Sequence, residues 1–209
     1  MVCSHEGTEA MDSLAQNGED VVLYKLLQRI GVRFGVAVEI GAMPGYRYSN
    51  IRAIPGLVKQ YVDCEDHGYN TVCRVTTENV DELLASLTEQ KDFALLSIDI
   101  DGNDYWIWRA IKNHAPDVVI IEMNPSLSGK KTVKYDPDLV FKNTNYFGAS
   151  FDALVALGWA KGYLPYFCNG GNIIFVHRRH HATVIPLPTV GYKPRRGWPL
   201  EKERRFVDV

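Results

Sequence analysis

Apolar residues along the chain follow two spacings, one typical of helices and one typical of strands. Between residues 20 and 30, apolar side chains recur from Leu23 at positions i, i+3, i+4 and i+7, which is the periodicity of an amphipathic helix. Residues 35–40 (GVAVEI) and 118–123 (VVIIEM) are instead short runs rich in β-branched side chains, as in strands that are buried on both faces. The pattern therefore predicts an α/β protein.

Extending this pattern predicts the order of elements over most of the chain. We expect helices at residues 20–30, 79–87, 104–113 and 151–162, and strands at 35–40, 60–64, 71–76, 93–101, 118–123, 163–167 and 172–176. The turn Asn169-Gly170-Gly171 would join the last two strands as a closing pair. Strands that alternate with helices favour right-handed crossovers and a doubly wound, mostly parallel sheet. We expect one domain over residues 1–176, followed by a tail at 177–209.

Composition narrows the class of protein without identifying a function. A length of 209 residues and an apolar content of 46% fit a single globular domain. No run approaches the roughly 18 apolar residues of a membrane-spanning helix, so none is expected. The polar start, MVCSHEGTEAMDS, argues against a signal peptide, and the four cysteines lack CxxC spacing. We therefore expect reduced thiols and a cytoplasmic location.

The net charge of −2 conceals a basic C-terminal segment. Residues 177–209 carry eight Lys or Arg and three Asp or Glu, a net charge of +5, which leaves −7 for the rest of the chain. Four prolines in this segment predict an extended tail that is solvated or docked on the acidic body. Nucleic-acid binding is not favoured, because basic and aromatic residues form no platform elsewhere. His177, His180 and His181 lack acidic or Cys partners at metal-ligand spacing, so we expect no metal there.

Acidic residues stand at the ends of several predicted strands. The run LLSIDIDGND ends a buried strand in Asp99, Asp101 and Asp104. Charges are costly to bury, and the ligands of doubly wound sheets bind at the carboxyl ends of the strands. Glu39 ends the first strand, and Asp63 ends the second, where nucleotide-binding sheets place an acid that accepts hydrogen bonds from ribose. We therefore expect a ligand site along one edge of the sheet.

Residues 99–104 (DIDGND) also admit two interpretations that involve a metal. The segment resembles a calcium-binding loop, but its glycine comes two positions too early and a buried strand precedes it, so calcium is not favoured. The DxD formed by Asp99 and Asp101 is also the tripeptide with which glycosyltransferases hold a divalent metal and a nucleotide-sugar diphosphate. DxD is a frequent tripeptide, so a metal-dependent glycosyltransferase stays a minority interpretation.

Seven motifs in a defined order provide a more specific signal. They are AQNGED (15–20), VEIGAxxGxxxSN (38–50), VTTENVDELL (75–84), LLSIDIDGNDYWIW (95–108), VVIIEMNPS (118–126), YFGAS followed by AL…L…KGY (146–163), and GGNIIFV (170–176). Together they resemble the FkbM-like group of S-adenosylmethionine (SAM)-dependent methyltransferases over roughly residues 15–176. The resemblance implies a class I, Rossmann-like fold with a closing antiparallel strand, and SAM as the cofactor.

The resemblance also implies roles for individual residues. Around the cofactor it places Glu39, Gly41 and Gly45 at the methionine part, Ser49 and Asn50 on a following helix, Asp63 (alternatively Glu65) at the ribose, and Asp99 at the amino group. On the acceptor side it places Asp101, Asp104, Glu122 and Asn124. Gln16 and Glu19 would close over the pocket or, alternatively, cap the first helix.

The reaction that the resemblance implies is direct, in-line displacement of the methyl group from SAM. The protein then mainly aligns the acceptor, which we expect to be a hydroxyl of a small molecule or glycan. Asp101 or Asp104 is the candidate base for the departing proton. No metal ligand is assigned, although a metal held by the same aspartates could instead lower the pKa of an acceptor hydroxyl. The sequence does not indicate an oligomeric state.

Two departures from the family pattern bear on the cofactor site. Met43 and Pro44 occupy a turn where the family usually carries a small residue and an acid, and they would stiffen it. Only seven residues separate Asp63 from Thr71, whereas a parallel crossover usually needs about a dozen. Either the strands on the two sides pair differently or one of them is vestigial. A non-catalytic, methyltransferase-like scaffold therefore stays open as an alternative function.

Overall fold

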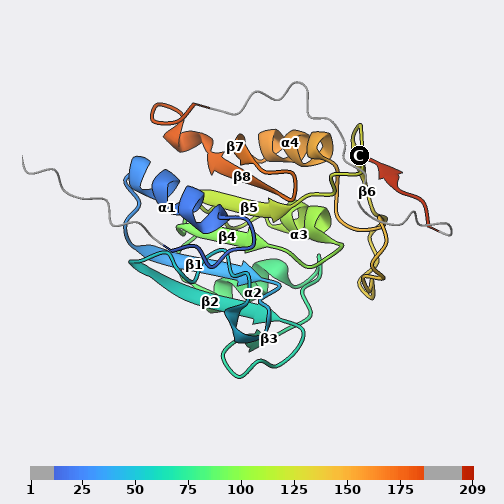
Figure 1. Ribbon diagram of the computed structural model, residues 1–209, viewed down its shortest axis with the longest axis horizontal. Coiled ribbons are helices and arrows are strands. Elements are labelled where there is room, and N and C mark those ends of the chain that lie inside the picture. Colours follow the sequence, from blue (N-terminus) through green and yellow to red (C-terminus); the bar gives the residue numbers. More distant parts are fainter. Residues whose placement is uncertain (1–11, 186–203) are drawn as a thin grey trace, which may run out of the picture.

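The computed structural model describes residues 12–185 and 204–209, and it contains a seven-stranded sheet with helices on both faces (Figure 1). The strands are β1 (Gly35–Ile40), β2 (Leu57–Asp63), β3 (Thr71–Val72), β4 (Leu95–Ile98), β5 (Val118–Glu122), β7 (Tyr163–Cys168) and β8 (Asn172–His177). The helices are α1 (Glu19–Arg29), α2 (Val80–Leu87), α3 (Asp104–Ala110) and α4 (Phe151–Ala160), with short 3-10 helices η1 (Pro44–Tyr46) and η2 (Arg178–His180). Every helix and strand that the apolar pattern predicted is present, although several are shorter than expected.

The strand order in the sheet is β3-β2-β1-β4-β5-β8-β7. The first five of these strands pair in parallel, whereas β8 runs antiparallel to both β5 and β7. The order reverses between β1 and β4, which is the switch point of a doubly wound sheet. The expected fold, Rossmann-like and mostly parallel with a closing antiparallel strand, is therefore confirmed.

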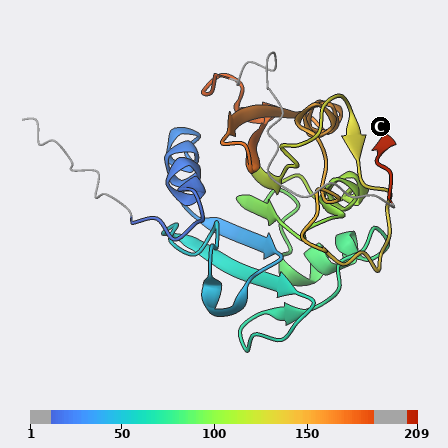
Figure 2. The same cartoon turned by 45° about the vertical axis from the view of Figure 1, so that its right-hand side comes forward.

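The two faces of the sheet are covered by different helices. Leu23 and Leu26 of α1 pack on one face, whereas α2, α3 and α4 pack on the other (Figure 2). Strand residues alternate between these faces: in β5, Ile120 packs with α1 and Ile121 packs with the other three helices. Burial on both faces explains why the strands are nearly continuous apolar runs. Within the described part of the chain, none of the helices is long and apolar enough to cross a membrane.

The connection between β1 and β2 contains no α-helix, so the expected helical position of Ser49 and Asn50 is wrong. Tyr46 and Tyr48 adopt positive φ angles of 58° and 59°, and η1 is the single helical turn in this connection. Left-handed conformations at two non-glycine residues interrupt an α-helix. Ser49 and Asn50 lie instead in an irregular turn that leads into β2.

β3 is only two residues long, and its position explains the short connection after β2. Thr71 lies opposite Val62, and Val72 lies opposite Asp63, in a parallel pairing. Because β3 begins level with the last residues of β2, residues 64–70 do not have to travel back along the strand. The connection therefore needs no crossover helix. Of the two arrangements expected from the sequence, the vestigial strand is the one observed.

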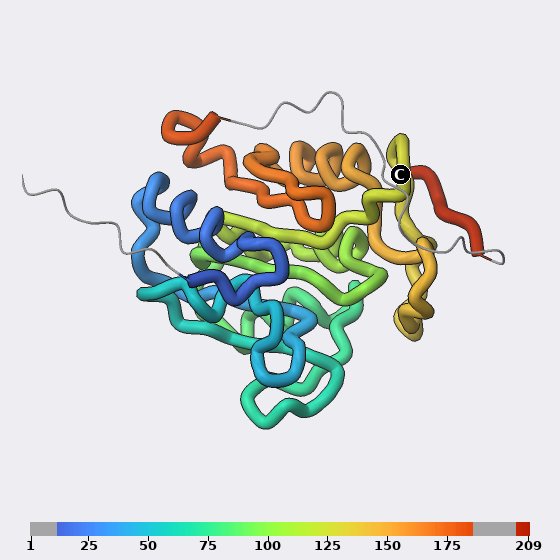
Figure 3. Tube along the Cα trace, viewed as in Figure 1, coloured from blue at the N-terminus to red at the C-terminus, as the bar shows by residue number. Residues whose placement is uncertain are grey.

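The end of the C-terminal segment packs on the body in a second, small sheet. β9 (Val207–Asp208) pairs antiparallel with β6 (Lys131–Thr132), a pairing that the apolar pattern did not predict (Figure 3). The docking of residues 204–209 agrees with one of the two states expected for the tail, whereas the prolines at 186–199 lie outside the described residues. At the start of the segment, His180 Nε2 lies 2.7 Å from Asp117 Oδ1, an acidic partner that the sequence spacing did not reveal.

Candidate functional site

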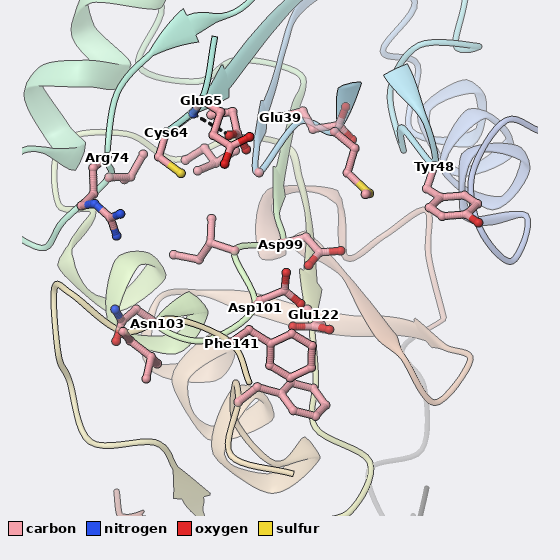
Figure 4. Close-up of a pocket in the computed structure, with 18 of the residues that line it drawn as sticks. Glu39, Tyr48, Cys64, Glu65, Arg74, Asp99, Asp101, Asn103, Glu122 and Phe141 are labelled. Atoms are coloured by element: carbon pink, nitrogen blue, oxygen red, sulfur yellow. Dashed lines mark hydrogen bonds between the residues drawn. The ribbon is translucent and has the colours of Figure 1, made fainter. Parts of the chain in front are cut away.

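A pocket of about 780 Å³ opens at the carboxyl ends of β1, β2, β4 and β5 (Figure 4). Its volume lies within the range of small-molecule sites. Most of the residues that the sequence analysis assigned to cofactor or acceptor line it, namely Glu39, Gly41, Asn50, Asp63, Asp99, Asp101 and Glu122. Gly45, Asp104 and Asn124 are not part of the lining. One pocket thus collects acids that lie far apart in the chain.

The pocket lies where the α1 face of the sheet changes from apolar to polar. Glu39 comes two positions after Ala37 in β1, and Glu122 comes two positions after Ile120 in β5. Side chains two positions apart in a strand share a face, so both acids continue apolar rows that pack under α1. Asp99 follows the same spacing just beyond the end of β4. The sheet itself therefore presents these acids to the pocket.

Glu39 is buried, and it ties the β1–β2 turn to the sheet. Its Oε2 accepts a hydrogen bond from the Ser49 hydroxyl (2.6 Å), and its Oε1 accepts one from the Asn50 backbone N–H (2.7 Å). Asn50 Nδ2 donates in turn to Ser97 Oγ on β4 (3.1 Å). Burial raises the pKa of Glu39 to about 7, although its two hydrogen bonds oppose the rise. Glu39 therefore supports the turn and adds charge to the pocket wall.

Gly41 allows the chain after β1 to approach the chain after β4. Its φ is +91°, and a Cβ at this position would lie 1.6 Å from the carbonyl oxygen of Asp99. No residue other than glycine fits such a backbone contact. Gly41 lines the pocket, but the close approach of its backbone to the Asp99 carbonyl already requires glycine at this position.

Asp99 and Asp101 face the pocket, whereas Asp104 does not. Asp104 is fully buried at the start of α3, and its two carboxylate oxygens accept hydrogen bonds from the backbone N–H groups of Ile100 and Gly102 (both 2.9 Å). Burial raises the pKa of Asp104 to about 6, and these hydrogen bonds oppose the rise. Asp104 therefore shapes the loop that carries the other two aspartates, and the structure does not bring it to an acceptor.

Asn124 and Glu19 do not line the pocket, and both form hydrogen bonds within the protein instead. Asn124 is buried, and its Nδ2 donates to the carbonyl oxygens of Asn145 and Phe147 (both 2.8 Å). Glu19, at the start of α1, accepts four hydrogen bonds from neighbouring asparagines. Of the two N-terminal residues expected over the pocket, Gln16 reaches it and Glu19 does not.

The carboxylates of Asp99, Asp101 and Glu122 converge in the pocket. One oxygen of each lies within 4.8 Å of those of the other two, and Figure 4 shows the three groups pointing toward one another. Burial and repulsion from neighbouring carboxylates raise the pKa values of Asp99 and Glu122 well above their usual range. Burial also raises the pKa of Asp101. Such a cluster favours a positively charged ligand, because a cation relieves the repulsion.

Asn172 completes this part of the pocket and was missed by the sequence analysis. It lies opposite Glu122 in the β5–β8 pairing, so the two side chains share a face of the sheet. Its Nδ2 donates to Glu19 Oε1 (2.9 Å). Asn172 Oδ1 and Glu122 Oε2 are both buried and have no hydrogen-bond partner among the described residues. The hairpin turn at 169–171 is visible in the sequence, but the cross-strand register that pairs these two residues is not.

The opposite end of the pocket is formed by the residues that follow β2 and β3. Asp63 Oδ1 accepts a hydrogen bond from the backbone N–H of Glu65 (2.8 Å) and lies 3.5 Å from His67 Nε2. Glu65 is exposed, and Arg74 contributes a positive charge to the lining. Figure 4 shows these two side chains near Cys64. This end therefore offers both acceptors and donors to a polar ligand.

An irregular segment between β6 and α4 supplies apolar lining that the sequence analysis also missed. Its pocket residues are Pro137, Leu139, Val140, Phe141 and Phe147. Asn103 Nδ2, at the start of α3, donates to the carbonyl oxygen of Asp136 (2.7 Å) and so holds this segment against the β4 loop. Since the segment forms no helix or strand, apolar periodicity could not identify it.

Comparison with known proteins finds similar structures but no family. No protein-family model matches the chain, and no curated protein matches it in sequence. The N-terminal domain of EvdMO1 with SAH bound has a TM-score of 0.47 and 11% identity, covering 79% of this chain and 82% of that chain. The 1,6-didemethyltoxoflavin-N1-methyltransferase of Burkholderia thailandensis, with bound 1,6-didemethyltoxoflavin and S-adenosylhomocysteine, has a TM-score of 0.45 and 13% identity, covering 77% of each chain.

A third structure, the sugar N-methyltransferase KedS8 from Streptoalloteichus sp ATCC 53650, has a TM-score of 0.45 and 10% identity. The match covers 85% of this chain and 99% of that chain. The FkbM-like resemblance therefore stays a prediction.

Proposed function

We propose that the chain is a SAM-dependent methyltransferase that transfers the methyl group to a hydroxyl of a small molecule or glycan. The observation that carries the proposal is the position of the acid-lined pocket, at the switch point between β1 and β4 of a doubly wound sheet. Nucleotide-containing ligands bind at this place in such sheets. The seven motifs support the same cofactor.

The lining fits a ligand that combines positive charge with a nucleoside. The ammonium and sulfonium groups of SAM would face Glu39 and Asp99, whose pKa values are raised by burial and, for Asp99, also by repulsion from neighbouring carboxylates. A bound cation favours the ionised form of each of these groups. At the opposite end, Asp63 and Glu65 line the pocket where ribose hydroxyls need acceptors.

The chain's own residues would align the acceptor and receive its proton. When bound, SAM supplies a methyl group that is activated by the positive charge on its sulfur. Leu139 and Phe141 line the pocket from the irregular segment and would exclude water from the acceptor. Asp101 would accept the proton that the acceptor hydroxyl loses as its oxygen bonds to the methyl carbon. Burial raises the pKa of Asp101, which brings it closer to the value that suits a base near neutral pH.

Isothermal titration calorimetry with SAM and S-adenosylhomocysteine tests the cofactor. We expect dissociation constants in the micromolar range, and we expect Asp99→Asn to weaken binding by about tenfold or more because it removes a charge that faces the cofactor. Glu89→Gln removes an exposed acid outside the pocket, so this matched control should bind like the wild type. An absence of heat and of any thermal shift at millimolar SAM would favour the non-catalytic scaffold.

A metal-dependent glycosyltransferase is the second candidate function, and the observation that favours it is the convergence of Asp99 and Asp101 with Glu122. It predicts that a nucleotide sugar such as UDP-glucose binds only when Mn²⁺ is present, and that SAM does not bind. Titrating both ligands, with and without MnCl₂, therefore separates the two enzymes in one series of measurements.

A further inference from the structure

We propose that Asp99, Asp101, Glu122 and Asn172 form a binding site for a divalent metal ion. The site does not depend on the methyltransferase function, although it shares Asp99 with the cofactor contact and Asp101 with the proton acceptor proposed above. Three carboxylates and an amide oxygen are hard donors of the kind that Mg²⁺, Mn²⁺ and Ca²⁺ prefer. They come from the ends of β4, β5 and β8, which are hydrogen-bonded neighbours in the sheet.

The distances among the three carboxylates fit a single ion. Two oxygens bound to one ion are separated by at most twice the metal–oxygen distance, which is about 4.2 Å for Mg²⁺ and about 5 Å for Ca²⁺. One oxygen of each carboxylate lies within 4.8 Å of the others. This upper limit lies below the largest separation of two Ca²⁺ ligands, so the three oxygens are close enough together to be brought onto one ion.

Asn172 provides evidence for a ligand that is independent of the acids. The residue lines the pocket and is only 7% exposed, yet its Oδ1 is buried and has no hydrogen-bond partner among the described residues. Glu19 fixes the orientation of the amide, because a carboxylate accepts hydrogen bonds and so faces Nδ2 rather than the oxygen. An unpaired buried oxygen is costly. A metal ion would provide a partner for this oxygen and for the unpaired Oε2 of Glu122.

The acid cluster also lacks a counter-charge from the part of the chain that the structure describes. Among residues 12–185 and 204–209, no Lys, Arg or His forms an ion pair with Asp99, Asp101 or Glu122. Burying like charges without a partner is unfavourable, and proteins that do so usually bind a cation or keep the groups protonated. The unpaired amide oxygen beside the cluster favours the cation.

Titration of the metal-free protein with CaCl₂, MgCl₂ and MnCl₂ tests the site directly. We expect saturable binding of one ion per chain by calorimetry, and a rise of several degrees in Tm with at least Ca²⁺. The measurement is made without SAM, so its outcome is separate from that of the cofactor titration. If none of the three salts gives saturable heat up to about 10 mM, beyond the range of weak protein calcium sites, the proposal is overturned.

Variants locate the ion. Glu122→Gln keeps the shape of the side chain but removes one carboxylate ligand, so metal affinity should fall by about tenfold or more. Because the change also removes a buried like charge, the metal-free variant should melt at or above the wild-type temperature, which distinguishes a lost ligand from a damaged fold. Asn172→Ala should weaken binding severalfold, and Glu89→Gln should bind like the wild type. Equal affinity of Glu122→Gln and the wild type would show that the ion binds elsewhere.

Discussion

The two ends of the pocket are built in different ways. The buried end consists of Glu39, Asp99, Glu122 and Asn172, which stand at the ends of strands in the middle of the sheet. The open end consists of Asp63, Cys64, Glu65 and Arg74, which flank the two-residue strand β3 at the edge of the sheet. The same pocket therefore joins a desolvated wall to a largely solvated one.

The difference shows how burial changes the chemistry of similar side chains. At the buried end, Glu39 is buried and Asp99 and Glu122 are half-buried, and this burial raises the pKa values of their carboxyl groups. At the open end, Glu65 is exposed and the connection is a seven-residue loop. Charge at the buried end is therefore available for recognition of a cation, whereas the open end can adjust its shape to a ligand.

The largest effect is expected where the buried end is joined to the sheet. Gly41→Ala would place a methyl group against the carbonyl of Asp99, so we expect a loss of more than about 4 kcal/mol in the free energy of unfolding, or failure to fold. Gly45→Ala is the matched control, since φ is +65° there but nothing lies within 4 Å of the added Cβ. Gly45→Ala should lower the free energy of unfolding, measured with urea, by about 1 kcal/mol. Similar losses in both variants would contradict the close contact.

The next effect is a pH dependence of stability that belongs to the buried end. The pKa of Glu39 is about 7 in the folded protein, above its usual value of 4.5. The folded protein therefore binds the proton of Glu39 more tightly than the unfolded chain does. The stability that this proton contributes is complete below pH 4.5 and is lost as the pH rises through about 7. At about pH 8, Glu39→Gln should be more stable than the wild type by up to about 3 kcal/mol, and at about pH 4 the two should be nearly equal.

Urea unfolding at the two pH values measures this difference, and the open end supplies its control. Glu65→Gln changes an exposed side chain, so it should alter the free energy of unfolding by less than about 0.5 kcal/mol at either pH. If Glu39→Gln showed the same small change at both pH values, Glu39 would not be the titrating group.

A smaller effect concerns cofactor affinity at the open end. We expect Asp63→Asn to weaken SAM binding by about tenfold in calorimetry, because it removes a charged acceptor for ribose while keeping an oxygen that can accept the Glu65 N–H. Glu65→Gln should weaken binding by less than about threefold, since this exposed carboxylate is well hydrated in the free protein. The reverse order would assign the ribose contact to Glu65.

The smallest effects compare one buried and one exposed hydrogen-bonding side chain. Ser97→Ala leaves the buried Asn50 Nδ2 without its acceptor, so we expect a loss of about 1 kcal/mol in the free energy of unfolding. Cys64→Ser at the open end should change it by less than about 0.5 kcal/mol. Urea unfolding measures both changes. If Cys64→Ser lowered the free energy of unfolding more than Ser97→Ala does, the claim that one end is buried and the other solvated would be contradicted.

Part of the site was predictable because it depends on local patterns. Glu39, Asp99 and Glu122 end apolar strands, and parallel strands bring their carboxyl ends to one edge of the sheet. The same reasoning failed for Asp104, since nothing in the sequence indicates that its oxygens are occupied by the N–H groups of Ile100 and Gly102. It also failed for the turn after β1, where positive φ angles at two tyrosines replace the expected helix.

The amino-acid sequence alone determined which segments become the strands of the seven-stranded sheet and the four α-helices, since apolar periodicity reflects which side chains must leave water. It also determined that acids follow the buried strands. Only the tertiary structure decided which polar side chains line the pocket, because cross-strand register sets Asn172 beside Glu122 and because backbone N–H groups occupy the oxygens of Asp104. Contacts between residues distant in the chain carry no local signature, so neither the pairing of β6 with β9 nor the convergence of Glu122 with Asp99 and Asp101 could be derived before the fold was known.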